Sequence, residues 1–199
     1  MQWGSGRPAA GDPAAATAHC ERLVSCLPGV PAVVRDRYLD VRASNEVARR
    51  LSGAFEPGVN IARFTFLNPI VRLSTTVWED VAAMVAGSLR RSLEEHLEDG
   101  GFRALVGELA ARSDAFTRVW AADPAAGAGT GAFDLDHPVV GPLHLRFQDL
   151  AVVGAEAGTV MTLWYPTDPA SARRLERLAA DTDPGGRPVR RHHEGGPRR

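Results

Sequence analysis

Two segments of this chain carry residue types whose spacing could support binding chemistry. Residues 127–131 read Gly-Ala-Gly-Thr-Gly, a composition that suits a phosphate-binding loop, and His192-His193 is a pair of metal-binding side chains. A dinucleotide loop follows a strand and opens a helix, whereas here a helical pattern precedes the glycines and a strand pattern follows them. The histidine pair lies among arginines in a stretch with no structured partner. We therefore predict a flexible loop and a solvated tail, with no bound metal or cofactor.

Acidic and cysteine side chains elsewhere form no catalytic pattern. Arg90 and Arg91 stand at helical spacing before the carboxylates of residues 94–99, which predicts weak surface ion pairs. Cys20 and Cys26 lack the second pair of ligands that a zinc site needs. The chain has no Gly-x-Ser-x-Gly, His-Glu-x-x-His, Walker or Cys-x-x-Cys motif. We therefore expect that it is not an enzyme.

The composition is that of a folded protein with little net charge. The 199 residues are 44% hydrophobic and 24% charged, with a net charge of −1 and no lysine. Residues 31–180 carry 16 arginines and 19 acidic residues, a balance of −3, so the basic excess is confined to residues 181–199. This balance argues against a basic nucleic-acid-binding surface. No apolar run approaches the ~20 residues of a membrane span, and no signal peptide is visible, which predicts a cytoplasmic protein without membrane contact.

The elements that position these side chains can be read from the spacing of apolar residues, beginning with a helix and a β-hairpin. A short helix is predicted from Thr17 and ends at Pro28-Gly29, since this pair cannot continue it. Residues 31–36 and 38–44 then have the strand-like character of two half-buried antiparallel strands. A tight turn at Asp36-Arg37 would join them.

The sequence pattern in the middle of the chain predicts only helices. Ser44 or Asn45, and later Asn60, are placed to cap two short helices with their side chains. The longest helix is predicted from Thr76 to about Leu97, because apolar residues recur there at helical spacing. Further helices follow before the glycine-rich loop, and Ser113 would cap one of them.

After the glycine-rich loop, apolar and polar residues alternate again, as they do in a strand with one buried face. Leu143, Leu145 and Phe147 alternate with polar residues, and residues 160–165 alternate in the same way, before a last helix that Ser171 would cap. The order lacks repeated strand–helix–strand units. We therefore predict the α+β class, with a PAS-like antiparallel sheet of about five strands and several helices packed on one side of it.

The predicted domain organisation has four parts. Residues 1–17 form a flexible leader, residues 18–30 a linker helix, and residues 31–180 one domain. Residues 181–199, rich in glycine, proline, arginine and histidine, form a disordered Arg-rich tail.

Large apolar side chains lie on the predicted inward faces of helices and sheet. Two interpretations remain open: an ordinary filled core, or a core hollow enough to admit a long apolar ligand. The side chains concerned are Phe64, Phe66, Trp78, Phe102, Phe116, Trp120, Phe133, Phe147 and Trp164.

Several stretches, in order and at matching spacing, resemble one known family. They include Asn60-Ile-Ala-Arg-Phe-Thr-Phe-Leu-Asn-Pro-Ile-Val-Arg72, Leu105-Val-Gly-Glu-Leu-Ala-Ala-Arg-Ser113 and His137-Pro-Val-Val-Gly-Pro-Leu-His-Leu-Arg-Phe-Gln-Asp-Leu150. Residues 18–180 thus resemble the C-terminal ligand-binding domain of MmyB-like transcription regulators. The resemblance implies a PAS-like sensor domain with a pocket for a fatty acid or similar lipid-like molecule, behind a helix-turn-helix DNA-binding domain of the Xre type.

The resemblance also sets expectations for partners. Only residues 1–17 precede the linker helix, and they show no helix-turn-helix pattern. We therefore predict no specific DNA binding by this chain alone. A homodimer is a further possible assembly. The alternative to a ligand sensor is a PAS-like interaction or dimerisation module with no bound ligand.

Candidate site residues follow from the expectation of a long-chain carboxylic acid between sheet and helices. A buried carboxylate needs a hydrogen-bonded cation. Arg72 and Arg63, from the Phe-rich stretch that resembles the family, are the candidates, with Asn60 and His137 as supporting donors. The predicted wall contacts are Phe64, Phe66, Trp78, Val81, Trp120, Phe147 and Trp164.

Overall fold

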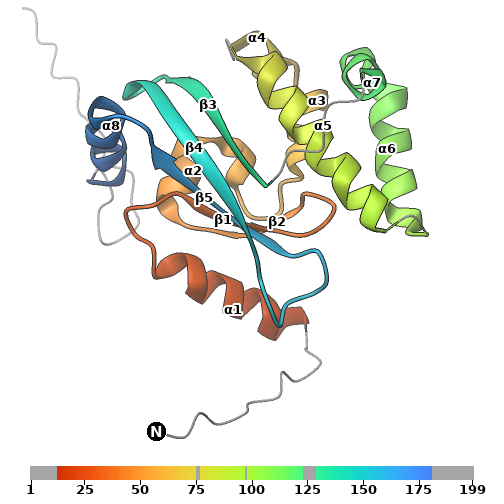
Figure 1. Cartoon of the computed structure of the whole chain (residues 1–199), viewed down its shortest axis with the longest axis horizontal. Helices are drawn as coiled ribbons and strands as arrows, with labels where there is room; N and C mark the ends of the chain where they lie inside the picture. The colour runs from red at the N-terminus through yellow and green to blue at the C-terminus, as the bar shows by residue number, and fades with distance from the viewer. Residues whose placement is uncertain (1–12, 75–76, 97, 123–128, 181–199) are drawn as a thin grey trace, which may run out of the picture.

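The computed structural model describes residues 13–74, 77–96, 98–122 and 129–180. They form a five-stranded antiparallel sheet in the order β2-β1-β5-β4-β3, surrounded by helices (Figure 1). The strands are β1 (Ala32–Arg35), β2 (Val41–Ser44), β3 (Thr130–His137), β4 (Gly141–Ala151) and β5 (Val160–Pro166). The helices are α1 (Pro13–Ser25), α2 (Glu46–Leu51), η1 (Gly53–Phe55), α3 (Ile61–Leu67), α4 (Pro69–Ser74), α5 (Trp78–Glu95), α6 (Gly100–Arg112), α7 (Asp114–Ala121) and α8 (Pro169–Ala180). The predicted α+β class with a PAS-like antiparallel sheet is confirmed.

The first helix begins earlier than the sequence pattern predicts. α1 starts at Pro13, four residues before Thr17, and so includes part of the predicted leader. Proline suits the first turn of a helix because it lacks the amide hydrogen that would be unpaired there, and the following alanines favour the helix. Residues 1–12 and the predicted tail at 181–199 lie outside the described residues.

The predicted hairpin forms, with a shorter second strand. β1 and β2 are antiparallel, but β2 begins only at Val41 because the chain between the strands makes a wider turn than Asp36-Arg37 alone. The carboxylate of Asp36 holds this turn by accepting hydrogen bonds from the backbone amides of Tyr38 and Asp40, at 2.9 and 3.0 Å. Leu39, within the turn, has a positive φ of 68°.

Polar side chains begin most of the short helices as predicted. Asn45 caps α2 and Asn60 caps α3, each accepting a hydrogen bond from a backbone amide three residues later. Ser113 caps α7 in the same way. The prediction that Ser171 caps the last helix is wrong: the carboxylate of Asp168 accepts from the first amides of α8. Asp168 lies one residue before the helix, where a cap side chain can reach those amides, whereas Ser171 lies inside it.

The longest helix of the described residues is α5, as predicted, and it is unbroken over 18 residues. It starts at Trp78 and ends at Glu95, slightly inside the predicted bounds. Thr76, the predicted first residue, and Leu97 lie outside the described residues. α5 packs against α3 and α7, so it forms the centre of the helical part of the domain.

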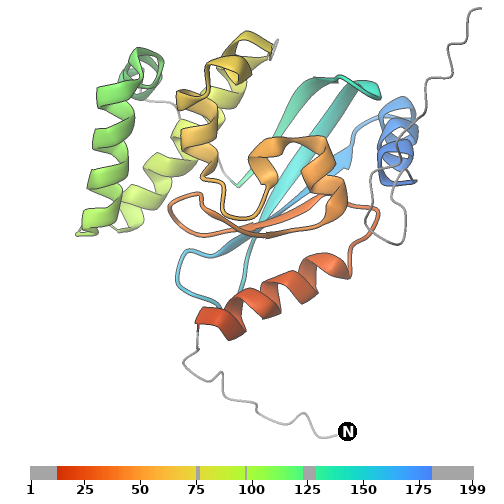
Figure 2. The same ribbon diagram turned by 180° about the vertical axis from the view of Figure 1, so that it is seen from behind.

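The two faces of the sheet are covered by different helices. α1 packs on one face, where Cys20 and Val24 contact Ala32, Val34 and Ala43. This corrects the expectation that the helices lie on one side only, because neighbouring apolar residues of β1 point to opposite faces and both faces need cover. The second view shows α1 and the group α5, α6 and α7 on opposite sides of the sheet, with α8 at the far end from α6 and α7 (Figure 2).

The other face is packed in two apolar clusters. One cluster joins the sheet to α2, η1 and α8, and includes Val33, Phe147 and Trp164. The second lies among α3, α5, α6 and α7, and includes the fully buried Phe102 and Phe116. The two clusters meet between the sheet and α5, and the candidate site lies at this boundary.

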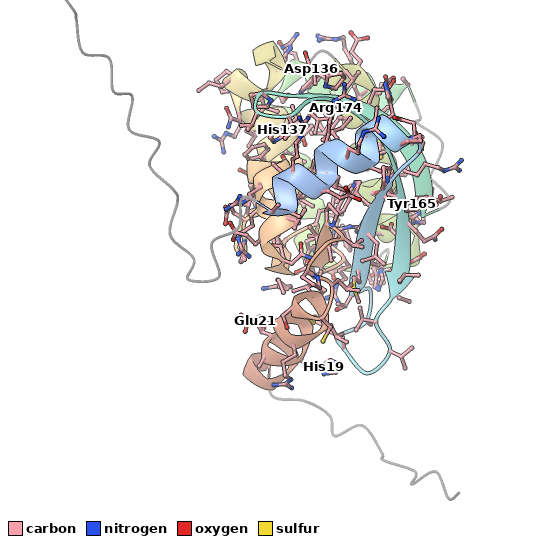
Figure 3. The ribbon with its side chains drawn as sticks, turned by 90° about the vertical axis from the view of Figure 1, so that its left-hand side faces the viewer. His19, Glu21, Asp136, His137, Tyr165 and Arg174 are labelled. Carbon is pink, nitrogen blue, oxygen red and sulfur yellow. The ribbon has the colours of Figure 1, made fainter. Side chains whose placement is uncertain are left out.

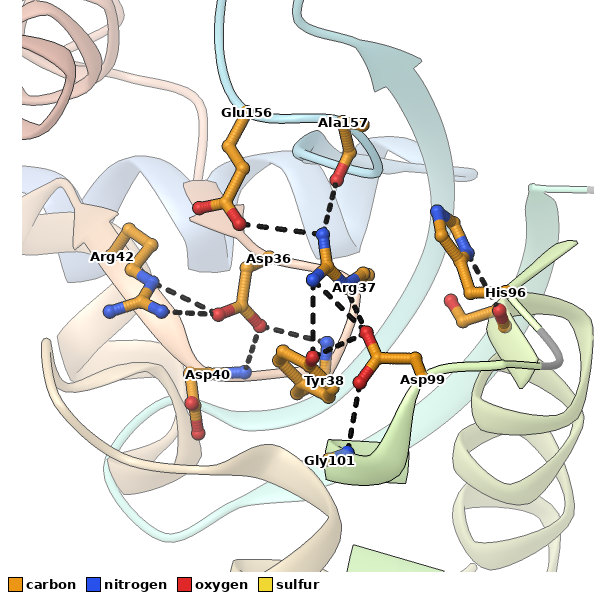
Figure 4. A network of polar contacts seen from close by, with 11 residues as sticks. Asp36, Arg37, Tyr38, Asp40, Arg42, His96, Asp99, Gly101, Glu156 and Ala157 are labelled. Carbon is orange, nitrogen blue, oxygen red and sulfur yellow. Dashed lines mark hydrogen bonds and ion pairs between the residues drawn. The ribbon is translucent and has the colours of Figure 1, made fainter. Parts of the chain in front are cut away.

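A polar network ties the β1–β2 turn to the helical part of the domain (Figure 4). The Arg37 guanidinium donates to Asp99, which precedes α6, and to Glu156 in the β4–β5 loop. The Tyr38 hydroxyl donates to the same Asp99 carboxylate. This hydrogen bond raises the pKa of Tyr38 and lowers the pKa of Asp99, because it favours the neutral phenol and the charged carboxylate.

The close approach of β3 to Phe147 gives a first testable prediction. A Cβ atom added at Gly131 would lie 2.5 Å from the Phe147 ring, whereas one added at Gly107, on the exposed side of α6, meets no atom within 4 Å. We expect Gly131→Ala to lower the free energy of unfolding by about 1–3 kcal/mol through overpacking. Gly107→Ala is expected to raise it by about 0.5–1 kcal/mol, because alanine favours the helix. Urea denaturation measures both, and a Gly131→Ala protein as stable as the unaltered one, or a loss of stability in Gly107→Ala, would contradict the packing described here.

Candidate ligand-binding site

A cavity lies between the inner face of the sheet and the helices α3 and α5. It offers about 160 Å³ to the centre of a water-sized sphere. The sheet contributes side chains from β1, β3, β4 and β5, and α5 contributes one face along most of its length. The lining consists of Arg35, Leu39, Leu51, Ser52, Ala54, Phe55, Ile61, Phe64, Thr65, Val71, Trp78, Val81, Met84, Val85, Ser88, Leu135, Phe147, Asp149, Thr162 and Trp164.

Most of the cavity wall is apolar. On the sheet side Phe147 and Trp164 are opposite each other on β4 and β5, and the Trp164 ring packs on Phe55 with centroids 4.6 Å apart. On the helix side the lining residues of α5 run from Trp78 to Ser88 at helical spacing. Ten residues of helix correspond to about 15 Å, so the wall is long enough for an extended apolar chain.

The polar part of the lining is a buried ion pair. The Arg35 Nη2 atom donates to the Asp149 Oδ2 atom at 2.8 Å, and the two side chains are 8% and 9% exposed. Thr162 donates its hydroxyl to the other carboxylate oxygen at 2.6 Å. Arg91, from α5, reaches the same Oδ2 atom at 3.5 Å. Two guanidinium groups therefore meet one carboxylate at this end of the site.

Burial dominates the electrostatics of Arg35. Removal from water lowers the pKa of its guanidinium, and the neighbouring charge of Arg91 adds to this lowering. The Asp149 carboxylate opposes it by Coulomb attraction and by the hydrogen bond. A further negative charge at this position would favour the charged form of Arg35 in the same way.

The sheet register explains why these groups meet. Asp149 is opposite Thr162 across β4 and β5, and Thr162 is opposite Val33 across β5 and β1. Arg35 lies two residues after Val33, so its side chain points to the same face. Asp149 likewise follows Phe147 by two residues. The polar group is therefore one step along the strands from the aromatic pair of Phe147 and Trp164.

Five of the residues predicted as wall contacts line the cavity. They come from α3, α5, β4 and β5, segments far apart in the sequence. They are Phe64, Trp78, Val81, Phe147 and Trp164.

The two other predicted wall residues lie in the neighbouring helical cluster, outside the cavity lining. The Phe66 ring packs edge-on against Phe116 at 5.0 Å. Trp120 stacks on Phe116 at 5.2 Å, and the Arg90 guanidinium lies over the Trp120 ring at 4.4 Å. Both residues therefore pack within the helical cluster rather than in the cavity lining.

Three of the predicted head-group residues have other partners in the structure and do not line the cavity. Asn60 caps α3 with its Oδ1 atom, and its Nδ2 atom donates to Asp40 at 2.7 Å. Arg63 forms an exposed ion pair with Glu108 at 2.8 Å. Arg72 is exposed, with its guanidinium 5.5 Å from the centre of the Trp78 ring.

His137 is buried at the end of β3, away from the cavity lining. Its Nε2 atom lies 2.8 Å from the backbone oxygen of Arg50, so it ties β3 to α2. Figure 3 shows His137 and Asp136 near α8 and Arg174, far from His19 and Glu21 on α1. The second histidine of this region, His144, is exposed on β4 and has its pKa raised by a hydrogen bond with Asp134.

Sequence reasoning missed Arg35 and Asp149, although a signal for both was present. The alternation that predicts Leu143, Leu145 and Phe147 as inward-facing continues to Asp149. The strand that contains Val33 continues to Arg35 in the same way. A search for oppositely charged residues at the ends of two apolar alternations would have found the pair.

No metal site is formed by the described ranges of the chain, where histidine, cysteine and acidic side chains do not gather in groups of three or more. The helices of the same ranges include none that is long and apolar enough to cross a membrane.

The fold and the cavity define a class: an α+β domain with a PAS-like sheet and an internal, largely apolar site closed by helices. A family model for the MmyB-like transcription regulator ligand binding domain matches residues 16–178. The chain belongs to this family, which is a ligand-binding domain of transcription regulators rather than a catalytic one. No curated protein matches the chain by sequence.

Proposed function

We propose that this chain is the sensor domain of an MmyB-like regulator, acts in the cytoplasm without catalysis, and binds a fatty acid or similar lipid-like effector in the cavity. The observation that carries the proposal is a long apolar cavity whose lining includes a buried ion pair beside its aromatic wall. An amphiphile has the matching chemistry, because its chain suits the apolar wall and its head group suits the polar end.

The size of the cavity supports a ligand with about a dozen chain atoms. On the measure used for its volume of about 160 Å³, one water-sized group needs roughly 10–15 Å³. The cavity therefore holds on the order of ten to fifteen such groups, and a methylene is close to water in size. Burial of ten methylenes contributes roughly 8 kcal/mol, against association costs of ~4–15 kcal/mol. A partner for the head group is thus needed for tight binding.

The proposal is tested with two matched variants. Val81 lines the cavity, whereas Val139 is 72% exposed in the turn between β3 and β4. Val81→Phe fills part of the cavity, so we expect it to weaken binding of dodecanoate at least roughly tenfold, from the loss of about two buried methylenes of ligand. Val139→Phe is expected to bind as the unaltered protein does. Displacement of a fluorescent fatty acid measures both affinities.

Native mass spectrometry of the gently purified protein supplies a second readout, because a co-purified lipid would appear as added mass. A protein that carries no lipid and binds neither dodecanoate nor the fluorescent probe at ~100 µM, a binding free energy of about 5 kcal/mol, would contradict the proposal. The interaction or dimerisation module would then be the better interpretation.

A further inference from the structure

We propose that Arg35 is the anchor for the head group of the ligand, and that the cavity therefore selects a monoanionic amphiphile, a carboxylate, over a neutral lipid of the same chain length. This inference rests on the proposed function, since it assigns the chemistry of the same cavity. Arg35 takes the role that the sequence predicts for Arg63 and Arg72, because the side chains of these two residues do not line the cavity.

The charge at this end of the cavity is unbalanced. Arg35 and Arg91 both approach the Oδ2 atom of Asp149, at 2.8 and 3.5 Å. The formal charge of the three side chains is therefore +1. One more monovalent anion would bring the group to neutrality, and the low dielectric of the interior makes this attraction stronger than at the surface.

Arg35 has donors to spare for such an anion. A guanidinium carries five N–H donors on three nitrogens. Within the ranges of the chain that the structure describes, its polar contact is the one from Nη2 to Asp149. The Arg35 side chain is more than nine-tenths buried and lines the cavity. The second N–H of Nη2 and the N–H of the nitrogen that shares its free edge suit a carboxylate, which can accept two parallel hydrogen bonds.

Both carboxylate oxygens of Asp149 already have hydrogen-bonding partners. Thr162 donates to Oδ1 at 2.6 Å, and the two arginines approach Oδ2. A ligand hydroxyl therefore finds little acceptor capacity there, whereas a ligand carboxylate finds the donors of Arg35. This asymmetry is the reason to expect preference for an anion over an alcohol.

The geometry also places the chain of the ligand. The Phe147–Trp164 pair is next to the Asp149–Thr162 pair along the two strands. A strand advances about 6.6 Å in two residues, so a head group at Arg35 puts the first methylenes against these aromatic rings. The remainder of the chain then extends along the face of α5 toward Trp78.

The test compares dodecanoate with 1-dodecanol, which share a chain and differ in head-group charge, below their aggregation concentrations. For the unaltered protein we expect dodecanoate to bind roughly 10- to 100-fold more tightly, the range of a hydrogen bond to a charged group. In Arg35→Met this ratio is expected to fall to about one, with dodecanol affinity nearly unchanged. In Asp149→Asn, which removes the competing carboxylate, the ratio is expected to rise by roughly tenfold or more.

Three further proteins keep the test decisive. Arg63→Met and Arg72→Met remove cations outside the cavity lining, and both should keep the ratio of the unaltered protein. If Arg35→Met does not fold, the double variant Arg35→Met/Asp149→Leu leaves no buried carboxylate without its partner and should also show a ratio of about one. A ratio is insensitive to a general loss of binding, because both probes need the same folded cavity.

The two proposals fail in different ways. If the unaltered protein binds neither probe, the sensor function and the anchor both fail. If it binds both probes equally, or if Arg35→Met keeps the preference for dodecanoate, the anchor assignment is overturned and the sensor function stands. Loss of the preference in Arg72→Met would likewise overturn the role of Arg35.

Discussion

Replacing Arg35 with methionine, with Asp149 left in place, is expected to lower the free energy of unfolding by about 3–5 kcal/mol. The Asp149 side chain is 9% exposed and would keep its hydrogen bond from Thr162 and the longer contact with Arg91. Neither contact replaces the Arg35 guanidinium, so the Asp149 carboxylate stays buried without its closest positive charge. Urea denaturation, followed by the fluorescence of the tryptophans, measures the loss.

Two further variants distinguish the cost of leaving the Asp149 carboxylate unpaired from the cost of losing the Arg35 side chain itself. The double variant Arg35→Met/Asp149→Leu is expected to recover most of the stability, because replacement of a buried pair by apolar groups is often neutral. Arg63→Ala breaks the ion pair with Glu108, whose members are 46% and 28% exposed, and is expected to cost about 0–1 kcal/mol. An Arg35→Met protein as stable as Arg63→Ala would show that the buried pair contributes little.

The second large effect is expected at Asn45, a buried side chain that joins three elements. Its Nδ2 atom donates to the backbone oxygens of Leu27 and Val30, both at 2.7 Å. Its Oδ1 atom accepts from the amides of Ala32 and Ala48, at 3.2 and 3.1 Å. Asn45→Ala leaves these four groups without their partner, and each unsatisfied buried group costs about 1–3 kcal/mol. We expect a total loss on the order of 3 kcal/mol or more.

Asn68 is the matched control for this prediction. It also precedes a helix and accepts from one backbone amide, that of Ile70, but in an exposed position. Asn68→Ala is expected to cost about 0.5–2 kcal/mol, the ordinary value of a helix cap. Limited proteolysis gives a second readout, since Asn45→Ala should expose the segment between α1 and β1 to cleavage sooner. Equal stability losses in the two variants would mean that Asn45 acts only as a cap.

The order of elements follows closely from local sequence signals. Asn45, Asn60 and Ser113 cap helices as their positions predict, because a cap depends on one side chain and the next three amides. The period-two pattern around Leu145 predicts a strand with one buried face, and the strand has it. What local signals do not contain is which helix covers which face of the sheet, and so the place of α1 was not predicted.

Local sequence signals predict the residues of the candidate site less well than they predict the order of elements. Arg63 is predicted as an anchor because it lies in the Phe-rich stretch that resembles the family, yet adjacent residues of a helix point in directions about 100° apart. Phe64 lines the cavity and Arg63 reaches Glu108 outside it. The ion pair of the cavity lining, Arg35 and Asp149, joins residues 114 positions apart in the chain. Only the strand order, which brings β1 and β4 to either side of β5, makes them neighbours.

The strand β1 alone separates the cavity on one face of the sheet from α1 on the other. Val33 and Arg35 face the interior, whereas Ala32 and Val34 face Cys20 and Val24 of α1. A displacement of the β1 backbone moves the side chains of both faces together, because they are attached to the same strand. Such a displacement at the cavity would therefore also change the surface on which α1 packs, without a contact through any other element.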